Sequence, residues 1–289
     1  MQHGELAQAR DILAGTWQGE ILAHSFVPHL VPKPIGWGVF ASAPNSYFYI
    51  AEYISFQQQA TNPQQWAKAL STLHNATRGK SPGGKFGFGA PTYMAWIPAD
   101  NTWEDTWEKT WTRKIRALFE EELKLNGPDD ELAKLKEVFF SSVVPRLLRP
   151  LETGGRKIEP VLLHGDTWLG NIKVRGGTDE ACMFDFCASW GHNEADLSTT
   201  YNPRYGLQDA ADPYNKLQPK SEPAEDFHGR VQLYAIKSAA LLSTMYGGGK
   251  FRDMMRYELG LLVEKYGKDE VPKTVMPSVS YLQSEESGR

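Results

Sequence analysis

Two short apolar segments each run directly into a loop that carries an acidic residue. Residues 160–163 are followed by Asp166, and Asn171 stands five positions after that acid; residues 181–184 end directly at Asp185. Apolar runs of this length between polar stretches are typical of short buried strands. We therefore expect two such strands to hold a rigid loop, with these two carboxylates and one amide at fixed separation.

This spacing matches the catalytic loop of a kinase, in which His-x-Asp is followed by Asn and later by a second Asp. Phosphoryl transfer depends mainly on positioning and charge neutralisation. Asp166 would orient the acceptor hydroxyl and accept its proton, while Asn171 and Asp185 supply the hard oxygen ligands that Mg²⁺ prefers. His164 is interpreted as an orienter of the loop rather than as a base. A lone His-Gly-Asp would mean no more than a turn with an exposed acid, so the prediction rests on the joint pattern.

The rest of the chain predicts a small β-containing part followed by a helical body. A helix over 5–13 is expected to stop at Gly15, and aromatic and β-branched residues over 35–40 and 47–54 predict a hairpin. Further helices are expected over 64–74, 102–125, 132–148, 227–246 and 250–266, with a loose tail after Val271. The Trp103, Trp107 and Trp111 stripe is read as core packing.

The predicted fold class is therefore α+β: a protein-kinase-like fold of the aminoglycoside-phosphotransferase type, with a reduced β N-lobe and a mainly helical C-lobe. The expected boundary separates residues 1–55, holding a helix, a hairpin and a hinge, from residues 56–289, holding the catalytic and metal-binding loops. The 289 residues are enough for a buried core in such an arrangement.

Composition limits the partners and the compartment. The formal net charge is −4, without a basic cluster, which argues against nucleic acid and anionic membrane surfaces as partners. No apolar run approaches the ~18 residues of a transmembrane helix. Cys182 and Cys187 could pair, but a reduced pair is the favoured interpretation in a chain of this size. A cytoplasmic enzyme is expected.

Several motifs resemble the fructosamine kinase family, whose members are also called ketosamine-3-kinases or protein-ribulosamine 3-kinases. The stretch His164–Asn171 is similar to the family's His-Gly-Asp-Leu-Trp-x-Gly-Asn, with Thr167 in place of Leu. The segment Phe184–Leu197 resembles its second, more specific signature, which includes Gly-His-x-Glu. Lys85–Phe88 and the tryptophans of the 102–125 helix add to the resemblance, and Pro145–Gly155 is similar to fungal members. It extends over roughly residues 15–268.

The resemblance implies ATP- and Mg²⁺-dependent phosphorylation of the 3-hydroxyl of a ketosamine, the sugar adduct of an amine or a protein lysine. The product of such a reaction is unstable, so the outcome is deglycation. The family match implies Asp166 as the base and Asn171 and Asp185 as metal ligands. It also implies that the hinge Glu52, Tyr53 and Ile54 binds adenine through backbone groups. Substrate-binding or loop-orienting roles are expected for His164, Trp168, His192 and Glu194.

The N-terminal part departs from the family pattern. No glycine-rich hairpin precedes Gly15, and the first lysine is Lys33, so the expected phosphate-binding strand lysine is missing. The helix glutamate that should pair with that lysine falls on Thr16 in an ungapped alignment, which we favour over Glu20, since Glu20 requires a gap of four residues. Loss of these parts would cost roughly 4 kcal/mol or more of transition-state stabilisation.

Three alternatives follow from these departures. The chain could be a truncated kinase, a catalytically impaired pseudokinase or ligand-binding member of the family, or a kinase for another amine such as a choline- or aminoglycoside-like compound. The second signature argues against the last of these. An incomplete small lobe would also expose a strand edge over 35–54, which a second copy of the chain could cover.

Overall fold

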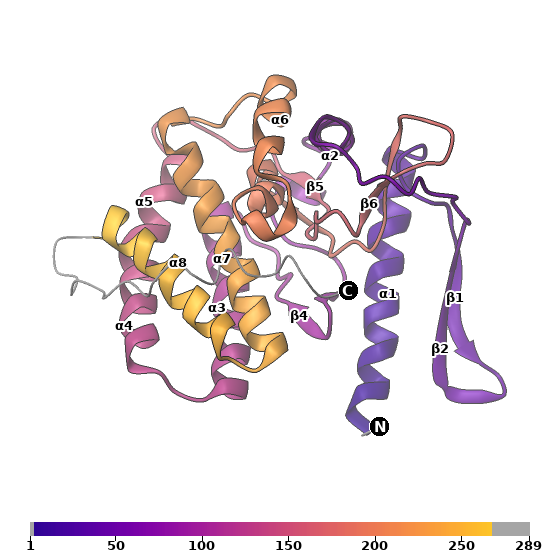
Figure 1. Ribbon diagram of the computed structural model, residues 1–289, viewed down its shortest axis with the longest axis horizontal. Helices are drawn as coiled ribbons and strands as arrows, with labels where there is room; N and C mark the ends of the chain where they lie inside the picture. The colour runs from indigo at the N-terminus through magenta and orange to yellow at the C-terminus, as the bar shows by residue number, and fades with distance from the viewer. Residues whose placement is uncertain (1–2, 268–289) are drawn as a thin grey trace.

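The computed structural model describes residues 3–267, which form a mainly helical molecule with small antiparallel sheets (Figure 1). The order of the main helices and strands up to the catalytic loop is α1 (His3–Phe26), β1 (Pro34–Phe40), β2 (Ala43–Ala51), α2 (Pro63–Thr77), β3 (Thr92–Met94), β4 (Ile97–Ala99), α3 (Trp107–Asn126), α4 (Asp130–Val138), α5 (Val144–Leu148) and β5 (Val161–Leu163). A single π-helical turn, Phe139–Val143, joins α4 to α5.

The second half of the chain contributes three further short strands and three helices. They are β6 (Ile172–Val174), β7 (Ala181–Met183), β8 (Ser189–Gly191), α6 (Ala211–Leu217), α7 (Phe227–Tyr246) and α8 (Lys250–Tyr266), with a 3-10 helix over Asn193–Thr200 between β8 and α6. The helices expected over 227–246 and 250–266 are confirmed. The expected loose tail after Val271 lies outside the described residues.

The first helix is much longer than the sequence predicted. It continues through Gly15 and Gly19 to Phe26, so the expectation that Gly15 ends it is wrong. A Cβ on Gly15 would lie 2.0 Å from the Pro91 carbonyl oxygen, and one on Gly19 would lie 2.8 Å from the Ala188 Cβ. The two glycines are thus explained by close packing of the helix against other segments, which outweighs their low helix propensity.

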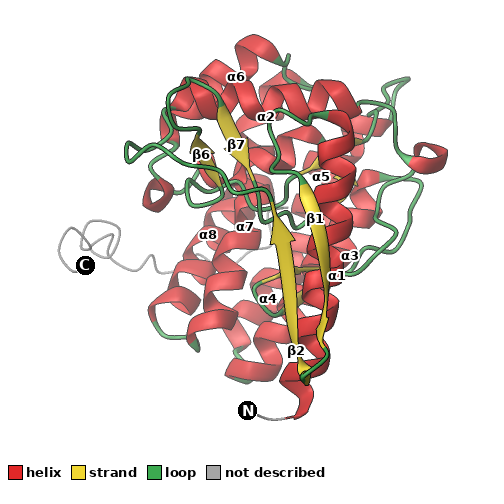
Figure 2. Cartoon of the chain, turned by 90° about the vertical axis from the view of Figure 1, so that its right-hand side faces the viewer, coloured by secondary structure: helices red, strands yellow, loops and turns green. Residues whose placement is uncertain are grey.

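The hairpin β1–β2 lies beside α1 at one side of the molecule (Figure 2). It matches the predicted hairpin, although β2 begins earlier than expected, at Ala43. Within residues 3–267 each strand leaves one edge without a strand partner, and large apolar side chains of the hairpin remain exposed: Ile35, Val39, Phe40 and Ile50.

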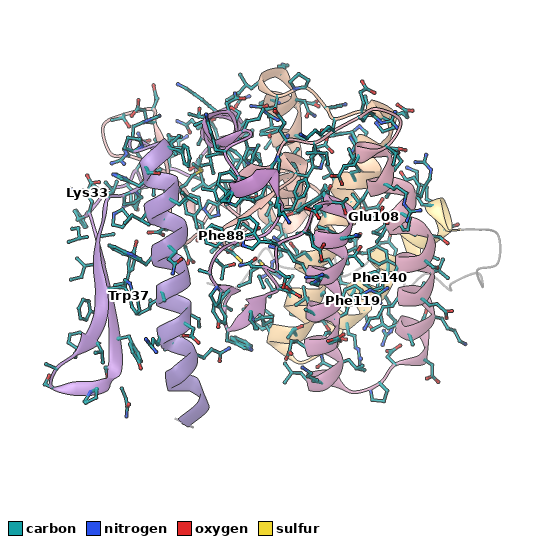
Figure 3. All side chains as sticks on the ribbon, turned by 180° about the vertical axis from the view of Figure 1, so that it is seen from behind. Lys33, Trp37, Phe88, Glu108, Phe119 and Phe140 are labelled. Carbon is teal, nitrogen blue, oxygen red and sulfur yellow. The ribbon has the colours of Figure 1, made fainter. Side chains whose placement is uncertain are left out.

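Helices α3, α4, α5, α7 and α8 gather at the opposite side and enclose the larger part of the core. The tryptophan stripe behaves as predicted: Trp107 and Trp111 are buried in this cluster, and Trp103 packs on a second cluster around α2. Figure 3 shows Phe119 and Phe140 in the same helical region, where their rings meet edge to face. The expected continuous helix over 132–148 is interrupted by the π turn.

Two short ladders fix the loops that the sequence singled out. β5 pairs with β8 through Leu163 and Ser189, and β6 pairs with β7 through Ile172 and Met183. The chain passes from β7 into β8, so Asp185 falls between the two ladders, close to the loop that follows β5. Cys182 and Cys187 are both buried and free, as the sequence favoured.

Among residues 3–267, no helix is both long enough and apolar enough to cross a membrane.

Candidate active site

Asp166 and Asn171 are brought together as the sequence predicted. The Asn171 Nδ2 group donates to the Asp166 Oδ2 atom over 2.9 Å and to the Asp166 carbonyl oxygen over 3.1 Å. Burial raises the pKa of Asp166 to about 6, while the positive charge of Lys237 opposes the rise. The amide thus holds the carboxylate in one orientation, as a base that must face an incoming hydroxyl requires.

Asp185 joins this pair from the other ladder. The Phe184 N–H donates to the Asn171 carbonyl oxygen over 3.1 Å, which sets Asp185 beside the amide. Asp185 has a positive φ of 62°, a conformation that costs free energy in a non-glycine residue and is common at functional sites. Asp166, Asn171 and Asp185 therefore converge as predicted.

The donor set fits Mg²⁺. Partial desolvation raises the pKa of Asp185, and among the described residues no hydrogen-bond donor reaches its carboxylate. No group of three or more His, Cys, Asp or Glu side chains that could hold a metal ion occurs in the described part of the chain. A divalent cation here would thus rely on Asp185, the Asn171 amide oxygen and oxygens from a ligand, which is how Mg²⁺ is commonly held.

His164 is fully buried and does not face the cleft as a base. Its Nε2 atom lies 3.1 Å from the Phe184 carbonyl oxygen, the Asp166 N–H donates to its Nδ1 atom over 3.2 Å, and its ring stacks on Phe186. Burial lowers its pKa to about 4, so the ring is neutral at pH 7. These contacts favour the loop-orienting role.

Asp196 anchors the catalytic loop, a role that the sequence analysis did not assign. Its Oδ2 and Oδ1 atoms accept the N–H groups of His164 and Gly165 over 2.8 and 2.9 Å, and His74 Nε2 lies 3.1 Å from Oδ2. Its backbone carbonyl accepts the Thr167 hydroxyl over 2.7 Å. The only signal in the sequence was its place inside the second signature.

We predict that Asp196→Asn lowers the free energy of unfolding by about 1–3 kcal/mol. An amide offers one acceptor oxygen where the carboxylate offers two, so one buried N–H of the loop loses its partner. Urea denaturation would measure the change, with Asp212→Asn, an exposed position on α6, as the matched control. Equal midpoints for the two variants would contradict the anchoring role.

The segment after β2 lines a cleft of about 860 Å³, and Asp185 forms part of the wall of the same cleft. Glu52, Tyr53 and Ile54 all border it, as the hinge prediction requires. The Glu52 N–H is already donated to the Lys33 carbonyl oxygen over 2.9 Å, and in the described structure Tyr53 and Ile54 have no such backbone bond. Backbone recognition of a planar ring would thus fall to Tyr53 and Ile54 rather than to the Glu52 amide nitrogen.

Glu20, and not Thr16, lies against the metal-binding loop. Its Oε1 atom accepts the Asp185 N–H over 2.7 Å, and its Oε2 atom accepts the Tyr49 hydroxyl. Burial raises the pKa of Glu20. Thr16 lies one turn earlier on α1, also at the cleft. The ungapped alignment that favoured Thr16 as the helix glutamate position is therefore corrected, because the contact with Asp185 is made by Glu20.

The remaining predicted residues separate into an exposed one and two buried ones. The Trp168 ring is 45% exposed and covers Gly170, where a Cβ would lie 2.1 Å from the ring. His192 contacts the Tyr234 and Ser221 hydroxyls over 2.8 Å each. Glu194 pairs with Arg230 inside the core. His192 and Glu194 thus have loop-holding contacts, whereas the Trp168 ring remains partly exposed to solvent.

Comparisons with protein families and with solved structures identify relatives of this chain. The model of the fructosamine kinase family matches residues 19–261, a span that includes Glu20, the catalytic loop and the second signature. The chain belongs to the fructosamine kinase family. A relative in Arabidopsis thaliana, a chloroplastic protein-ribulosamine 3-kinase, is 28% identical over 222 residues, which is 76% of this chain and 62% of the relative. The chain spans about three fifths of the length of the first curated relatives it matches.

Solved structures confirm the predicted fold class. A Thermobifida fusca protein described provisionally as a fructosamine-3-kinase matches with a TM-score of 0.66 and 20% identity, over 86% of this chain and 81% of that one. A thermostable mutant of aminoglycoside phosphotransferase APH(4)-Ia matches with a TM-score of 0.59 and 14% identity, over 87% and 83% of the two chains. The fold of this member is therefore protein-kinase-like, of the aminoglycoside-phosphotransferase type.

Proposed function

We propose that this fructosamine kinase family member transfers the γ-phosphoryl group of ATP to the 3-hydroxyl of a ketosamine, the adduct of a sugar with an amine or a protein lysine. The observation that carries the proposal is the convergence of Asp166, Asn171 and Asp185 beside the hinge-lined cleft. The names of the relatives, which include protein-ribulosamine 3-kinase and ketosamine-3-kinase, support the choice of acceptor.

In this mechanism the chain's own residues position the reactants. The 3-hydroxyl oxygen attacks the γ-phosphorus, the bond to the β–γ bridging oxygen breaks, and ADP leaves. Asp166 accepts the hydroxyl proton, and Asn171 keeps its carboxylate in place. Asp185 and the Asn171 amide oxygen would hold Mg²⁺, which supplies charge neutralisation at the phosphates.

The experiment is phosphate transfer from magnesium-ATP to a synthetic fructosamine or ribulosamine, followed by phosphorus NMR. We expect a ketosamine 3-phosphate and ADP in equal amounts, followed by decay of the product to the free amine. An Asp166→Asn control should show neither. If the wild-type protein transfers no more phosphate than this control, the alternative of a pseudokinase or ligand-binding family member replaces the proposal, and a preference for choline or aminoglycosides would point to another acceptor.

Three further predictions accompany this function. We propose that residues 1–55 act as the nucleotide-covering lobe and residues 56–289 as the acceptor-binding and catalytic lobe, and that the enzyme works in the cytoplasm. We also propose self-association through the exposed edges of β1 and β2, where Ile35 is 61% exposed. Sedimentation velocity at micromolar concentration is expected to show a dimer, and a clean monomer would contradict this contact.

A further inference from the structure

A second cavity borders the catalytic loop and is separate from the cleft that the segment after β2 lines. Its volume is about 80 Å³, and no residue lines both spaces. By the same measure a water molecule needs roughly 10–15 Å³, so the cavity can hold several waters or the end of a small side chain. Gly165, the residue before Asp166, forms part of its wall. A group bound in this cavity would therefore belong to the acceptor rather than to the nucleotide.

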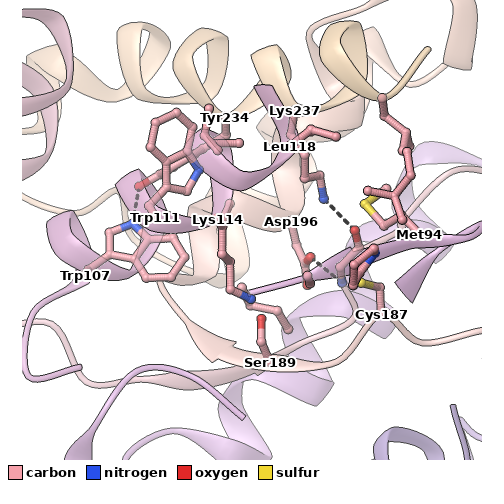
Figure 4. A pocket seen from close by; sticks show the side chains of 18 residues that line it. Met94, Trp107, Trp111, Lys114, Leu118, Cys187, Ser189, Asp196, Tyr234 and Lys237 are labelled. Carbon is pink, nitrogen blue, oxygen red and sulfur yellow. Dashed lines mark hydrogen bonds between the residues drawn. The ribbon is translucent and has the colours of Figure 1, made fainter. Parts of the chain in front are cut away.

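The walls are mostly apolar, but two lysines reach in from two helices (Figure 4). Trp107 and Trp111 of α3 and Tyr234 of α7 supply aromatic surface, and the lysines are Lys114 of α3 and Lys237 of α7. This combination suits a ligand that presents an apolar group and an anionic group side by side.

Neither ammonium group has a carboxylate partner within 4.0 Å in the described structure. Lys114 Nζ donates to the Asn101 Oδ1 atom over 2.9 Å, and Lys237 Nζ donates to the Gly165 carbonyl oxygen over 2.6 Å. Burial lowers the pKa of Lys114 to about 8, so it is mainly charged at pH 7. Both lysine side chains are half-buried, and Asp100 and Asp196 act on Lys114 only at longer range.

Asp196 is the one carboxylate among the residues that line the cavity, and both of its oxygens already have hydrogen-bond partners. Its two oxygens accept the loop N–H groups and contact His74, as described above. The cavity wall therefore carries two positive charges and one negative charge whose hydrogen-bonding capacity is largely used. Asp100 near Lys114 and Asp166 near Lys237 lie outside the lining and offset this charge, so an anion would be recognised by direct hydrogen bonds to the two ammonium groups.

We propose that this cavity is the subsite for the carboxylate and the end of a small apolar side chain of an amino acid whose α-amine carries the sugar. The inference rests on the proposed ketosamine kinase function. A few bonds separate the 3-oxygen of a ketosamine from its amine nitrogen, and the α-carboxylate is next to that nitrogen. With the 3-hydroxyl at Asp166, the carboxylate stands only a few bonds further on and would lie next to Gly165, which lines the cavity and accepts a hydrogen bond from Lys237.

The consequence is a preference among acceptors. A free amino-acid adduct carries its carboxylate next to the sugar-bearing amine. A protein lysine adduct does not, since its amine stands at the end of a long aliphatic chain. The lysine pair would therefore favour free ketosamine metabolites over glycated protein side chains.

The test compares the dissociation constants of two sugar adducts, one of leucine and one of leucinamide, by calorimetry without nucleotide. The two differ only in the carboxylate. A hydrogen bond to a charged group contributes about 1.5–3 kcal/mol, which corresponds to roughly 10- to 100-fold tighter binding of the leucine adduct. In Lys114→Gln, which keeps a donor for Asn101, this ratio should fall about tenfold or more.

Lys109→Gln is the matched control, because Lys109 is exposed on the same helix and should leave the ratio unchanged. Lys114→Met serves as a second variant, and circular dichroism checks that each protein is folded. Equal binding of the two adducts by the wild-type protein, or an unchanged ratio in both Lys114 variants, would overturn the subsite. Phosphate transfer to either adduct is measured separately, so failure of the kinase function is seen independently of the binding ratio.

Discussion

Replacing Asp166 with asparagine is expected to reduce phosphate transfer by roughly 10²–10⁴-fold, the usual contribution of a positioned general base. The substitution keeps the size of the side chain and an acceptor oxygen for the Asn171 amide, so the loop geometry should survive. The loss should appear in turnover, while the KM for ATP stays close to the wild-type value, because Asp166 lies outside the residues that line the nucleotide cleft.

The same variant should not lose stability in the absence of metal. Burial raises the pKa of Asp166 from its ordinary value to about 6, so its charged form weakens the folded state as pH rises through that value. At pH 7 a neutral amide removes this unfavourable term, and urea denaturation in the presence of a chelator should show an equal or higher midpoint. Asp179→Asn, at an exposed loop position, is the control. Full activity of the Asp166 variant would refute its role as the base.

The largest expected loss of stability comes from Arg230→Met. Arg230 is fully buried and donates to both Glu194 carboxylate oxygens, over 2.6 and 3.0 Å. Removing it leaves an uncompensated buried carboxylate, which typically costs about 3–5 kcal/mol. That is a large part of the ~5–15 kcal/mol that stabilises an ordinary domain. Urea denaturation at pH 7 would measure the change.

Arg149→Met provides the comparison, since Arg149 pairs with Glu108 at the surface and is 60% exposed. An exposed pair of this kind contributes at most about 1 kcal/mol. A double variant, Glu194→Leu with Arg230→Met, should recover part of the loss, because no charge is then left buried. If Arg230→Met unfolds at the same urea concentration as Arg149→Met, the buried pair does not stabilise the second signature as we describe.

The meeting of Asp166, Asn171 and Asp185 could be predicted because the three residues are close in the sequence. Asp166 and Asn171 share one loop, and Asp185 follows the apolar segment over 181–184. The spacing of these residues alone indicated that they meet. The fold class followed from the same stretch, since the strand pairs that hold these loops are short and their apolar character is evident. The hairpin was equally visible, because aromatic and β-branched residues dominate both strands.

The remaining features depend on contacts between distant segments. Whether Glu20 or Thr16 faces Asp185 depends on the rotation of α1 and on its tight packing at Gly15 and Gly19, which local helix propensity does not encode. The anchoring role of Asp196 likewise depends on N–H groups more than thirty residues away in the chain. Lys114 and Lys237 line the same cavity only because α3 packs against α7.

Tight packing of α1 links its two glycines to the position of Glu20. A Cβ at Gly15 or Gly19 would collide with the segments around Pro91 and Ala188, so a larger residue at either position would push the helix away from the body. Glu20 follows Gly19 directly and accepts the Asp185 N–H, so a displaced helix would withdraw the partner that holds the backbone of Asp185. The two glycines thus set the depth at which α1 carries its carboxylate to the predicted metal-binding loop.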